Sequence, residues 1–600
     1  MNNSAFIKVA SAIPQVQVAN CQFNAQRIEA LIKQAAEKQV QIICFPELCI
    51  TAYTCGDLFH QELLLDEAEK ALLQLVRNTA HLSIVSIVGL PMRCNNTLYN
   101  IAVVFQKGEI LGVVPKTNLC YEEQRYFSDF RHSWLRQTAE PSGEERNNLF
   151  TFGEIKFAVK IGDNQQDFSQ ETNIVFNLSA TAELVGKNKK LKEYICQQSE
   201  KTAYIYVSAG FGESTTDLVF AGNAYIAENG EIIASSERFS FDEQLIIGKI
   251  TPKSPKGDFA IVRQEKSPLG DLGVMHPFIP SNEEMDERCN EIFNIQVSGL
   301  ATRIKHTGVK TVTIGISGGL DSTLALLVCV KTFDKLQIPR RQIIGVTMPG
   351  FGTTNQTYNN AIDLMQQLGI SIREISIKEA CMQHFKDIGH DENICNAVYE
   401  NAQARERTQI LMDIANQTDG LVVGTGDLSE LALGWATYNG DHMSMYGVNA
   451  GVPKTLIRHL VRWAAGSENN DTQQTLLDIV ETPVSPELLP TKDGAISQKT
   501  EDLVGPYELH DFFLYYTVRH GFRPAKIYSL ATQAFENKYD CETIKKWLAV
   551  FFRRFFNQQF KRSCLPDGPK VGSVCLSPRG SWSMPSDASS EMWLKEIEDL

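Results

Sequence analysis

A glycine-rich turn between an apolar run and a helical run constrains the fold most strongly. Residues 312–316 have the composition of a buried strand, the turn at 317–322 reads SGGLDS, and residues 323–330 have the character of a buried helix. A strand joined to a helix by a short turn is the unit from which parallel sheets with covering helices are built. The turn therefore predicts an α/β domain whose ligand binds where this strand ends.

The same turn has the chemistry of an anion site. Its glycines let the backbone approach a ligand closely, and backbone N–H groups at the start of a helix attract phosphate. Ser317 and Ser322 add hydroxyl donors, whereas Asp321 would repel a bare phosphate and so indicates a bridging Mg²⁺. No GxxxxGK[ST] run is present here, so the turn is not a Walker-type loop. A capped helix after a buried strand is the simpler alternative.

Length, charge and cysteine content narrow the class of protein. A chain of 600 residues is too long for one hydrophobic core, so we expect at least two domains. The formal net charge of −14 argues against broad binding of nucleic acid or anionic membranes, and no apolar run is as long as a membrane span. The 14 cysteines form no CxxC pair and the first residues show no signal-peptide pattern, so we expect a cytoplasmic enzyme with reduced thiols.

The pattern of strands and helices changes along the chain at a turn-rich stretch. Before it, many short apolar runs alternate with few helical ones, which predicts a layered α/β sandwich. After it, strands at 343–347, 371–377 and 420–423 alternate with longer helices, which predicts a doubly wound parallel sheet. We therefore expect a first domain at 1–265, a linker at 266–285 and a second domain at 286–600. The strands expected in the first domain are 41–45, 84–90, 101–105, 157–161, 174–178 and 205–209.

Five further motifs fall where a doubly wound sheet would form its ligand crevice. They are ENAQAR at 400–405, GTGDLSELALGW at 424–435, YNGD at 438–441, PKTLIRHLVRW at 453–463 and FKRSCLP at 560–566. Together with SGGLDS, these runs closely resemble the NAD synthetases of the ATP-pyrophosphatase family, from about residue 294 to the end of the chain. SGGLDS alone marks the wider family, and the longer runs narrow the resemblance to NAD synthetase.

This resemblance implies a two-step reaction. The nicotinate carboxylate of deamido-NAD attacks the α-phosphate of ATP to give an acyl-adenylate and pyrophosphate, and ammonia then attacks the activated carbonyl to give NAD and AMP. Catalysis would come mostly from positioning and electrostatic stabilisation. The implied ATP site is Gly315, Ile316, Ser317, Gly318, Gly319, Leu320, Asp321, Ser322, Thr425 and Lys454. The implied Mg²⁺ ligands are Asp321 and Glu430, and the implied deamido-NAD site is Asn401, Glu430, Trp435, Ala436, Thr437, Tyr438 and Lys561.

Each of these residues also has a simpler structural interpretation. Glu430 suits the first turn of a helix, Lys561 suits a solvated face, and Trp435 and Tyr438 suit a hydrophobic core. Two alternative functions are a different ATP-pyrophosphatase, such as a GMP or asparagine synthetase, and a non-catalytic adenylate-binding scaffold. The long runs that match NAD synthetases argue against the first, and the intact set of charged residues argues against the second.

The first half resembles the nitrilase superfamily, as in the glutaminase domain of glutamine-dependent NAD synthetases. The resemblance implies an α-β-β-α sandwich and a Glu-Lys-Cys triad. Glu47 in FPEL matches the base, and Lys116 in PKTNL matches the lysine that would stabilise the oxyanion. The strand that would end in the nucleophile reads VKIGDN at 159–164, so Gly162 stands at the cysteine position. Glycine has no side chain and cannot form a thioester.

Other features of the first half agree with a lost amidase site. Several loops near this position are shorter than in the family. Cys44, Cys49 and Cys120 lie near Glu47 or Lys116 in sequence, but none stands at the end of the strand. We therefore expect a pseudo-glutaminase joined to an active synthetase that takes ammonia directly. A conventional glutamine-hydrolysing enzyme with a displaced nucleophile is the alternative. The expected partners are deamido-NAD, ATP and ammonia, or glutamine in that alternative, in a homo-oligomer.

Overall fold

The computed structural model describes residues 6–94, 97–129, 149–162, 172–251, 273–482, 488–489 and 500–600. The chain divides into two compact units, Met1–Ser214 with Val219–Gln264 and Thr215–Leu218 with Glu265–Leu600. A short segment from the first half of the sequence therefore belongs to the second unit. The expected linker at 266–285 lies outside the described residues as far as residue 272.

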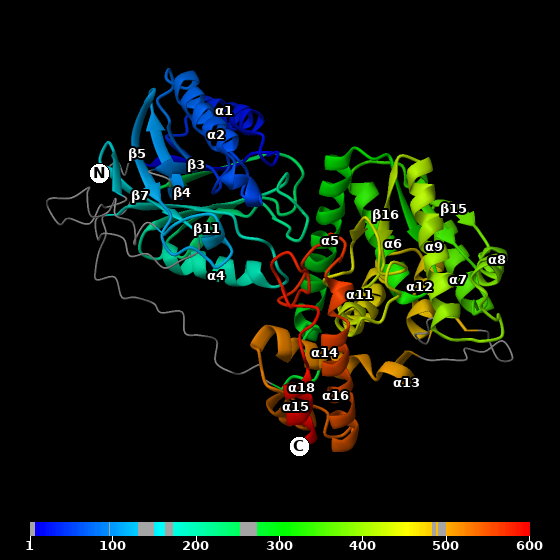
Figure 1. Ribbon diagram of the computed structural model, residues 1–600. Helices are drawn as coiled ribbons and strands as arrows, with labels where there is room; N and C mark the ends of the chain where they lie inside the picture. Colours follow the sequence, from blue (N-terminus) through cyan, green and yellow to red (C-terminus); the bar gives the residue numbers. More distant parts are fainter. Residues whose placement is uncertain are drawn as a thin grey trace. The chain divides into compact units, whose positions relative to one another are not determined.

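The first unit is built on two six-stranded sheets (Figure 1). One sheet has the order β12 (Gln244–Ile250), β1 (Ile7–Ile13), β2 (Ile42–Cys44), β3 (Val85–Cys94), β4 (Thr97–Gln106) and β5 (Glu109–Pro115). The other has the order β11 (Glu231–Ser235), β10 (Ala224–Glu228), β9 (Ala203–Ser208), β8 (Ile174–Ser179), β7 (Ile155–Ile161) and β6 (Leu149–Phe152). The six expected strands correspond to β2, β3, β4, β7, β8 and β9.

Alternating side chains place the two sheets face to face. In β1, Ile7 and Val9 share one core with Phe157 and Val159 of β7, whereas Ala10 faces the helices on the other side. This period of two is what a strand buried on both faces requires. Helices α1 (Cys21–Glu37) and α2 (Glu62–Asn78) pack on the outer face of the first sheet, and α4 (Lys187–Ser199) packs on the outer face of the second. The expected α-β-β-α sandwich is confirmed.

The second unit contains a five-stranded parallel sheet. Its order is β15 (Ser371–Glu374), β14 (Ile343–Thr347), β13 (Thr311–Gly315), β16 (Gly420–Gly424) and β17 (Tyr446–Gly447). The helices associated with it are α5 (Met285–Thr307), α6 (Leu320–Lys335), α7 (Asn355–Gln367), α8 (Lys378–Ile388), α9 (Ala397–Gln417), α10 (Leu428–Leu433), α11 (Lys454–Ala465) and α12 (Asn470–Glu481). The expected doubly wound sheet is confirmed.

The order of the strands fixes where a ligand can bind. From β13 the chain moves through α6 and β14 to β15, and it then returns through α9 to β16 on the other side of β13. Right-handed crossovers in opposite directions place α6 and α9 on opposite faces of the sheet. The chains leaving β13 and β16 therefore diverge, and a crevice opens at the carboxyl ends of these two strands.

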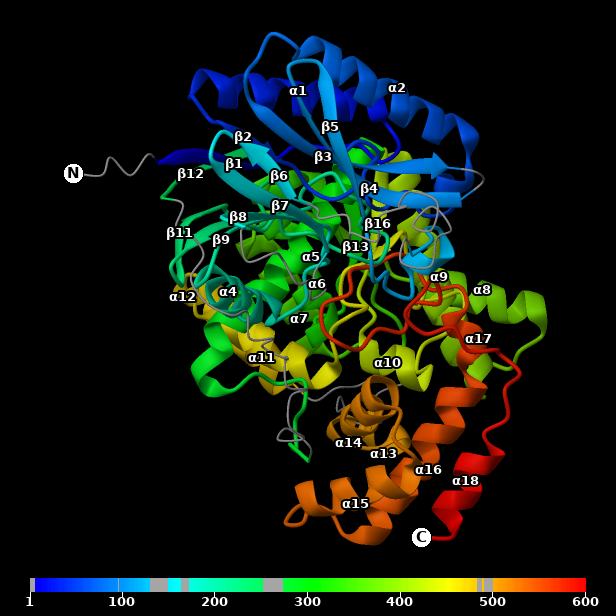
Figure 2. The ribbon, with the colours of Figure 1, turned by 90° about the vertical axis from the view of Figure 1, so that its left-hand side faces the viewer.

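A helical layer follows the sheet in sequence (Figure 2). Its helices are α13 (Thr500–Val504), α14 (Tyr507–Leu514), α15 (Pro524–Ala534), α16 (Cys541–Asn557), α17 (Gln559–Arg562) and α18 (Glu591–Glu598). Aromatic residues of α14 and α16, among them Phe512, Phe551 and Phe555, form one core with Leu428 and Leu431 of α10. This layer therefore supports the short helix that follows β16.

His510 gives this layer a testable pH dependence. Its ring is buried, Nε2 donates to the Val504 carbonyl over 2.6 Å, and burial lowers its pKa from 6.5 to about 4. In the unfolded chain the His510 ring is protonated below about pH 6.5, whereas in the folded chain it stays neutral down to about pH 4. The free energy of unfolding therefore falls as pH decreases through this window. Relative to His510→Gln, the native chain should lose about 2 kcal/mol of unfolding free energy between pH 7 and pH 5, measured by denaturant titration. Parallel pH curves for the two proteins would contradict this prediction.

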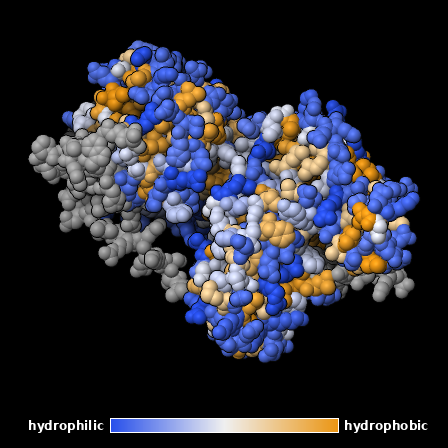
Figure 3. Space-filling view, in the orientation of Figure 1, coloured by the Kyte–Doolittle hydropathy of each residue, from blue (hydrophilic) through white to orange (hydrophobic). Residues whose placement is uncertain are grey.

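The distribution of apolar side chains agrees with burial in these cores. On the face drawn in Figure 3, hydrophilic residues predominate on both units and hydrophobic residues form smaller groups among them. Among the helices of the described residues, none combines the length and the apolar character that crossing a membrane requires.

Candidate functional site

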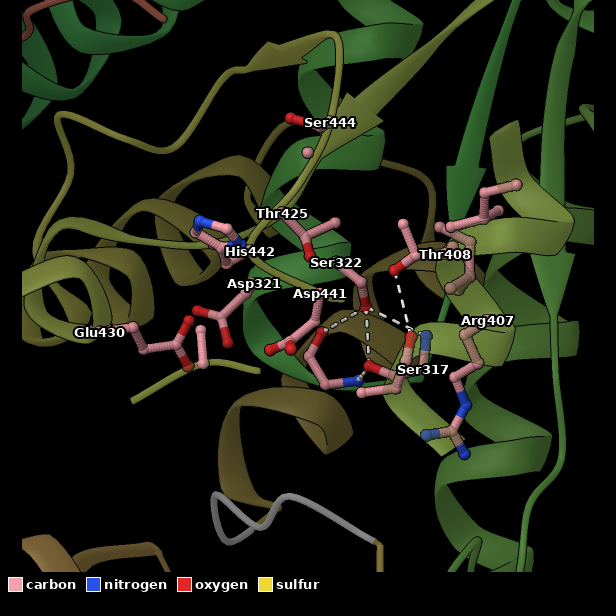
Figure 4. Close-up of a pocket in the computed structure, with 18 of the residues that line it drawn as sticks. Ser317, Asp321, Ser322, Arg407, Thr408, Thr425, Glu430, Asp441, His442 and Ser444 are labelled. Carbon is pink, nitrogen blue, oxygen red and sulfur yellow. Dashed lines mark hydrogen bonds between the residues drawn. The ribbon is translucent and has the colours of Figure 1, made fainter. Parts of the chain in front are cut away.

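A cavity of about 340 Å³ lies at the carboxyl ends of β13 and β16, within the second unit (Figure 4). Seven of the eight residues expected at 315–322 line it, together with Thr425, Glu430, Trp435 and Ala436. The wall facing the glycine turn comes from α9, which contributes Arg407 and Thr408. The cavity therefore collects residues from the turn after each of the two strands at which the sheet reverses direction.

Gly318, the one residue of 315–322 that does not line the cavity, sets the backbone conformation of the glycine turn. Gly318 has φ +82°, and a Cβ there would lie 2.0 Å from the Thr357 carbonyl oxygen, so only glycine fits. Ser317 and Ser322 lie 3.1 Å apart through their hydroxyl groups, and the Ser322 hydroxyl donates to the Gly319 carbonyl. Helix α6 begins at Leu320, earlier than expected, so Asp321 lies in its first turn. The helix N-terminus consequently faces the cavity.

An acidic cluster surrounds the Lys454 ammonium at one side of the cavity. Lys454 Nζ lies 2.6 Å from Asp321 Oδ2, 2.7 Å from Asp427 Oδ2 and 2.9 Å from Glu430 Oε1. Burial raises the pKa of Glu430 to about 7, and it raises the pKa of Asp427 well above its usual value. Three carboxyl groups around one ammonium leave an excess of negative charge in a buried place, which is costly without a further cation.

The donors of this cluster fit a divalent cation. Oxygen atoms of Asp321, Asp427 and Glu430 lie within 4.8 Å of one another. Asp321 Oδ1 is buried and has no hydrogen-bond partner among the residues that the structure describes. Clustered carboxylate oxygens are the ligands that Mg²⁺ prefers. The sequence expectation named Asp321 and Glu430 and missed Asp427.

A buried network of hydrogen bonds connects α10 and α11. Asp427 caps α10 by accepting from the Glu430 N–H over 2.9 Å, which orients the first turn of that helix. Asp511 of α14 accepts from the Ser429 hydroxyl and, over 2.6 Å, from the Thr455 hydroxyl. Burial raises the pKa of Asp511 to about 6. The positions of Glu430 and Lys454 are therefore set by a carboxylate from the helical layer.

Four residues expected to hold deamido-NAD lie beside the cavity and support its wall. Lys561 Nζ donates to the carbonyls of Gly434 and Ala436 over 2.7 and 2.6 Å. The Thr437 hydroxyl donates to Asn401 Oδ1 over 2.7 Å. Tyr438 is 43% exposed, so it is not a core residue. In this structure Asn401, Thr437, Tyr438 and Lys561 do not line the cavity, whereas Glu430, Trp435 and Ala436 do.

Arg407, Asp441 and His442 also line the cavity, and the sequence analysis gave none of them a site role, although Asp441 stands in the YNGD motif. In Figure 4 the carboxylates of Asp321 and Glu430 lie on one side of the cavity and the Arg407 guanidinium lies on the other. Asp441 accepts from the Thr437 N–H over 2.7 Å, and burial raises the pKa of Asp441. Burial lowers the pKa of His442. The run GDHM at 440–443 offered a signal, because binding residues are often carried by loops, and this loop between α10 and β17 contains two ionisable residues.

The first unit contains a second buried charge cluster. Lys116 Nζ lies 2.6 Å from Glu47 Oε1 and 2.6 Å from Glu123 Oε1, and Asn100 donates to Glu47 over 2.6 Å. Burial raises the pKa of Glu47 to about 7. Burial also acts to raise the pKa of Glu123, but the Lys116 charge and several hydrogen bonds bring it below 4.5. The structure thus brings Glu47 and Lys116 together, and it adds Glu123, which the sequence analysis missed.

Gly162 lies against this cluster at the end of β7. Its φ is +83°, in the left-handed region, and its N–H donates to the Leu178 carbonyl over 2.7 Å. A Cβ at this position would lie 2.9 Å from Lys116 Cε and 3.1 Å from Lys116 Nζ. Any side chain here would therefore require the buried lysine to move.

Two family models match the chain. The NAD synthase model matches residues 292–545, and the carbon-nitrogen hydrolase model matches residues 8–163. The chain is 36% identical to the glutamine-dependent NAD(+) synthetase of Mycobacterium bovis, and the match covers 99% of this chain and 98% of that relative. It is 26% identical to the glutamine-dependent NAD(+) synthetase of Aquifex aeolicus, over 95% of this chain and 97% of that relative.

Solved structures give the same fold. The glutamine-dependent NAD(+) synthetase from Cytophaga hutchinsonii matches with a TM-score of 0.79 at 21% identity, over 99% of this chain and 100% of that one. The glutamine-dependent NAD+ synthetase from Acinetobacter baumannii, solved in complex with adenosine diphosphate, matches with a TM-score of 0.66 at 21% identity, over 97% of this chain and 98% of that one.

Proposed function

Since this chain belongs to the family of glutamine-dependent NAD(+) synthetases and is a ligase that forms NAD with ATP, we propose that it takes its nitrogen directly from ammonia. The reaction would amidate deamido-NAD through an acyl-adenylate and release AMP and pyrophosphate. The observation that carries the ammonia proposal is the glycine at residue 162, the position at which the family resemblance leads us to expect the amidase nucleophile.

The cavity of the second unit would bind ATP at the glycine turn. Backbone N–H groups of residues 317–322 and the N-terminus of α6 would hold the departing pyrophosphate. Thr425, in the turn that follows β16, also lines the cavity. The adenosine diphosphate bound to the Acinetobacter baumannii protein supports a nucleotide site in this fold.

The acidic cluster would hold Mg²⁺. Asp321, Asp427 and Glu430 offer the ligands. Once the cation pairs with these carboxylates, the Lys454 ammonium would be able to interact with the phosphates. The cation would offset negative charge on the leaving group. The protein's own share is positioning: Asp511 and the Asp427 cap keep the carboxylates in place before substrate arrives.

Deamido-NAD would lie along the wall formed by residues 434–441. Trp435 and Ala436 line the cavity, while Lys561, Asn401 and the Thr437 hydroxyl support that wall from behind. Tyr438 is exposed and stacks on His442, with ring centres 5.3 Å apart. A nicotinate carboxylate placed here would approach the α-phosphate of an ATP whose pyrophosphate is held by the glycine turn.

Three observations support loss of the glutaminase. Gly162 has no side chain, and Lys116 fills the space into which one would project. Burial raises the pKa of the Cys44 and Cys49 thiols to about 12 and that of Cys120 to about 11, so none of them is an activated thiolate. The alignment with the Mycobacterium bovis relative spans 676 positions against 600 residues here, so that relative carries segments that this chain lacks, in agreement with the shorter loops expected in the amidase half.

The test compares two nitrogen sources in the purified full-length chain. NAD formation from deamido-NAD, ATP and Mg²⁺ should proceed with ammonium and stay at background with glutamine, when residual ammonia has been removed. Glutamine-driven activity equal to the ammonium-driven rate would overturn the ammonia proposal and favour a displaced nucleophile. No activity with either source, together with intact ATP binding, would favour an adenylate-binding scaffold.

Two further properties remain proposals. We infer a cytoplasmic, reducing environment, which the free state of all 14 cysteines supports. A homo-oligomer is inferred from the family resemblance alone, and sedimentation of the purified chain would test it.

A further inference from the structure

A short segment of the amidase-like sequence is built into the synthetase unit. Residues Thr215–Leu218 belong to the second unit, although the residues before and after them belong to the first. They fall within the first domain expected at 1–265. The second unit, which contains the ligand cavity, thus includes residues from both halves of the sequence.

The backbone of this segment is held at both ends by the second unit. The Thr215 hydroxyl donates to the Gly299 carbonyl of α5 over 3.0 Å, and the buried Tyr446 hydroxyl donates to the Thr215 carbonyl over 2.9 Å. The carbonyls of Thr216 and Asp217 accept from the N–H groups of residues 568 and 570 over 3.0 and 2.8 Å. Tyr446 lies in β17, the edge strand of the central sheet.

Asp217 forms a bidentate ion pair with Arg579. Arg579 donates to its carboxylate through Nε, at 3.0 Å from Oδ2, and through Nη2, at 2.8 Å from Oδ1. The same guanidinium donates to the carbonyls of Leu565 and Pro566 over 2.9 and 3.2 Å. A bidentate pair of this kind fixes the plane of the guanidinium as well as its position. Asp217 therefore orients the group that holds the 565–566 backbone.

The backbone held in this way is a wall of the cavity. Leu565 and Pro566 line it, and so does Gly447, whose N–H donates to the Asp567 carbonyl over 2.7 Å. Asp567 is in turn paired with Arg303 of α5. The contacts run without a gap from Asp217 through Arg579 to the surface that a ligand would touch.

We propose that Asp217 is a positioning residue of the synthetase, which braces the cavity wall at 565–566 through Arg579. The inference deepens the proposed function and rests on it. It gives the nitrilase-like half a task that does not depend on glutamine hydrolysis: it supplies the segment that shapes the synthetase pocket.

The experiment uses the full chain, with ammonium as the nitrogen source. Asp217→Asn keeps the size of the side chain and removes its charge. It should lower kcat/KM roughly tenfold, mainly by raising KM, because the wall is displaced rather than the reacting groups. Asp217→Glu should restore part of the loss. Asp334→Asn is the matched control, since Asp334 also forms a bidentate pair, with Arg340 at 2.8 and 2.6 Å, away from the cavity.

A double-mutant cycle with Arg579→Lys decides between a shared contact and two separate ones. If Asp217 and Arg579 act as one unit, kcat/KM of the double variant should be no lower than kcat/KM of the more impaired single variant. Additive losses, or an Asp217→Asn variant within twofold of the native chain, would overturn the proposal.

ATP dissociation constants measured by calorimetry separate this proposal from the proposed function. If the native chain binds ATP but forms no NAD, a roughly tenfold weaker binding by Asp217→Asn would still support the brace, and unchanged binding would overturn it. Absence of ATP binding by the native chain would overturn both proposals.

Discussion

An Asp321→Asn variant should lose about a hundredfold or more of kcat/KM for ammonium-driven NAD formation. Asp321 Oδ2 lies 2.6 Å from Lys454 Nζ, and its buried Oδ1 has no hydrogen-bond partner among the described residues. An amide is neutral, so the proposed Mg²⁺ site would lose one of three anionic ligands. Because Lys454 keeps Asp427 and Glu430 at 2.7 and 2.9 Å, the fold should survive the change. Steady-state kinetics over a range of Mg²⁺ concentrations would measure the effect.

The control for this variant is Asp419→Asn. Asp419 precedes β16, its side chain is 74% exposed, and it pairs with Lys310 at 3.1 Å. An exposed pair contributes little, so this variant should retain native kinetics. If Asp321→Asn also stayed within threefold of the native rate at every Mg²⁺ concentration, the acidic cluster would have no catalytic part.

The elements of the site that depend on local sequence could be predicted. The SGGLDS turn needs only a strand before it and a helix after it, and both are present as β13 and α6. The strand expected at 343–347 has the bounds of β14. The family resemblance implied that Glu47 and Lys116 share a site. The structure places them 2.6 Å apart, and they follow β2 and β5 of the same sheet.

Residues whose place depends on long-range packing could not be predicted in this way. Asp427 stands in an expected motif, but its sequence position suits a helix cap equally well, and it performs both tasks. Glu123 is close to Lys116 in sequence, but it contacts the Lys116 ammonium only because the chain between them turns back, which the residue pattern did not indicate. Arg579 lies in a tail rich in glycine, proline and serine, 362 residues from Asp217, where local sequence indicates only a loop.

Lys116→Met should destabilise the first unit by about 3–5 kcal/mol and leave ammonium-driven NAD formation within twofold of the native rate. The ammonium group lies 2.6 Å from both Glu47 and Glu123, and all three side chains are at most 7% exposed. Its removal leaves two buried carboxyl groups without a countercharge, which must take up protons or draw in water. Chemical denaturation followed by a probe in the first unit would measure the loss.

Two further variants show whether charge is the cause. Adding Glu47→Gln and Glu123→Gln to Lys116→Met removes the uncompensated carboxylates and should recover much of the stability. Lys70→Met removes a lysine that pairs with Glu67 at 2.7 Å but is 68% exposed, and it should cost well under about 1 kcal/mol. Equal losses in the two single variants would contradict the buried-charge explanation.

The rates of NAD formation by Lys116→Met show whether the cluster of Glu47, Lys116 and Glu123 is catalytic or structural. In an active amidase the lysine would be needed for glutamine-driven turnover, so its loss would abolish that activity first. Here Lys116 occupies the space into which a side chain at residue 162, the proposed nucleophile position, would project. A lysine that matters for stability and not for nitrogen supply would mean that the catalytic cluster has become a structural one. Loss of glutamine-driven synthesis in Lys116→Met, with ammonium-driven synthesis retained, would instead show that the cluster still works as an amidase with a nucleophile other than residue 162.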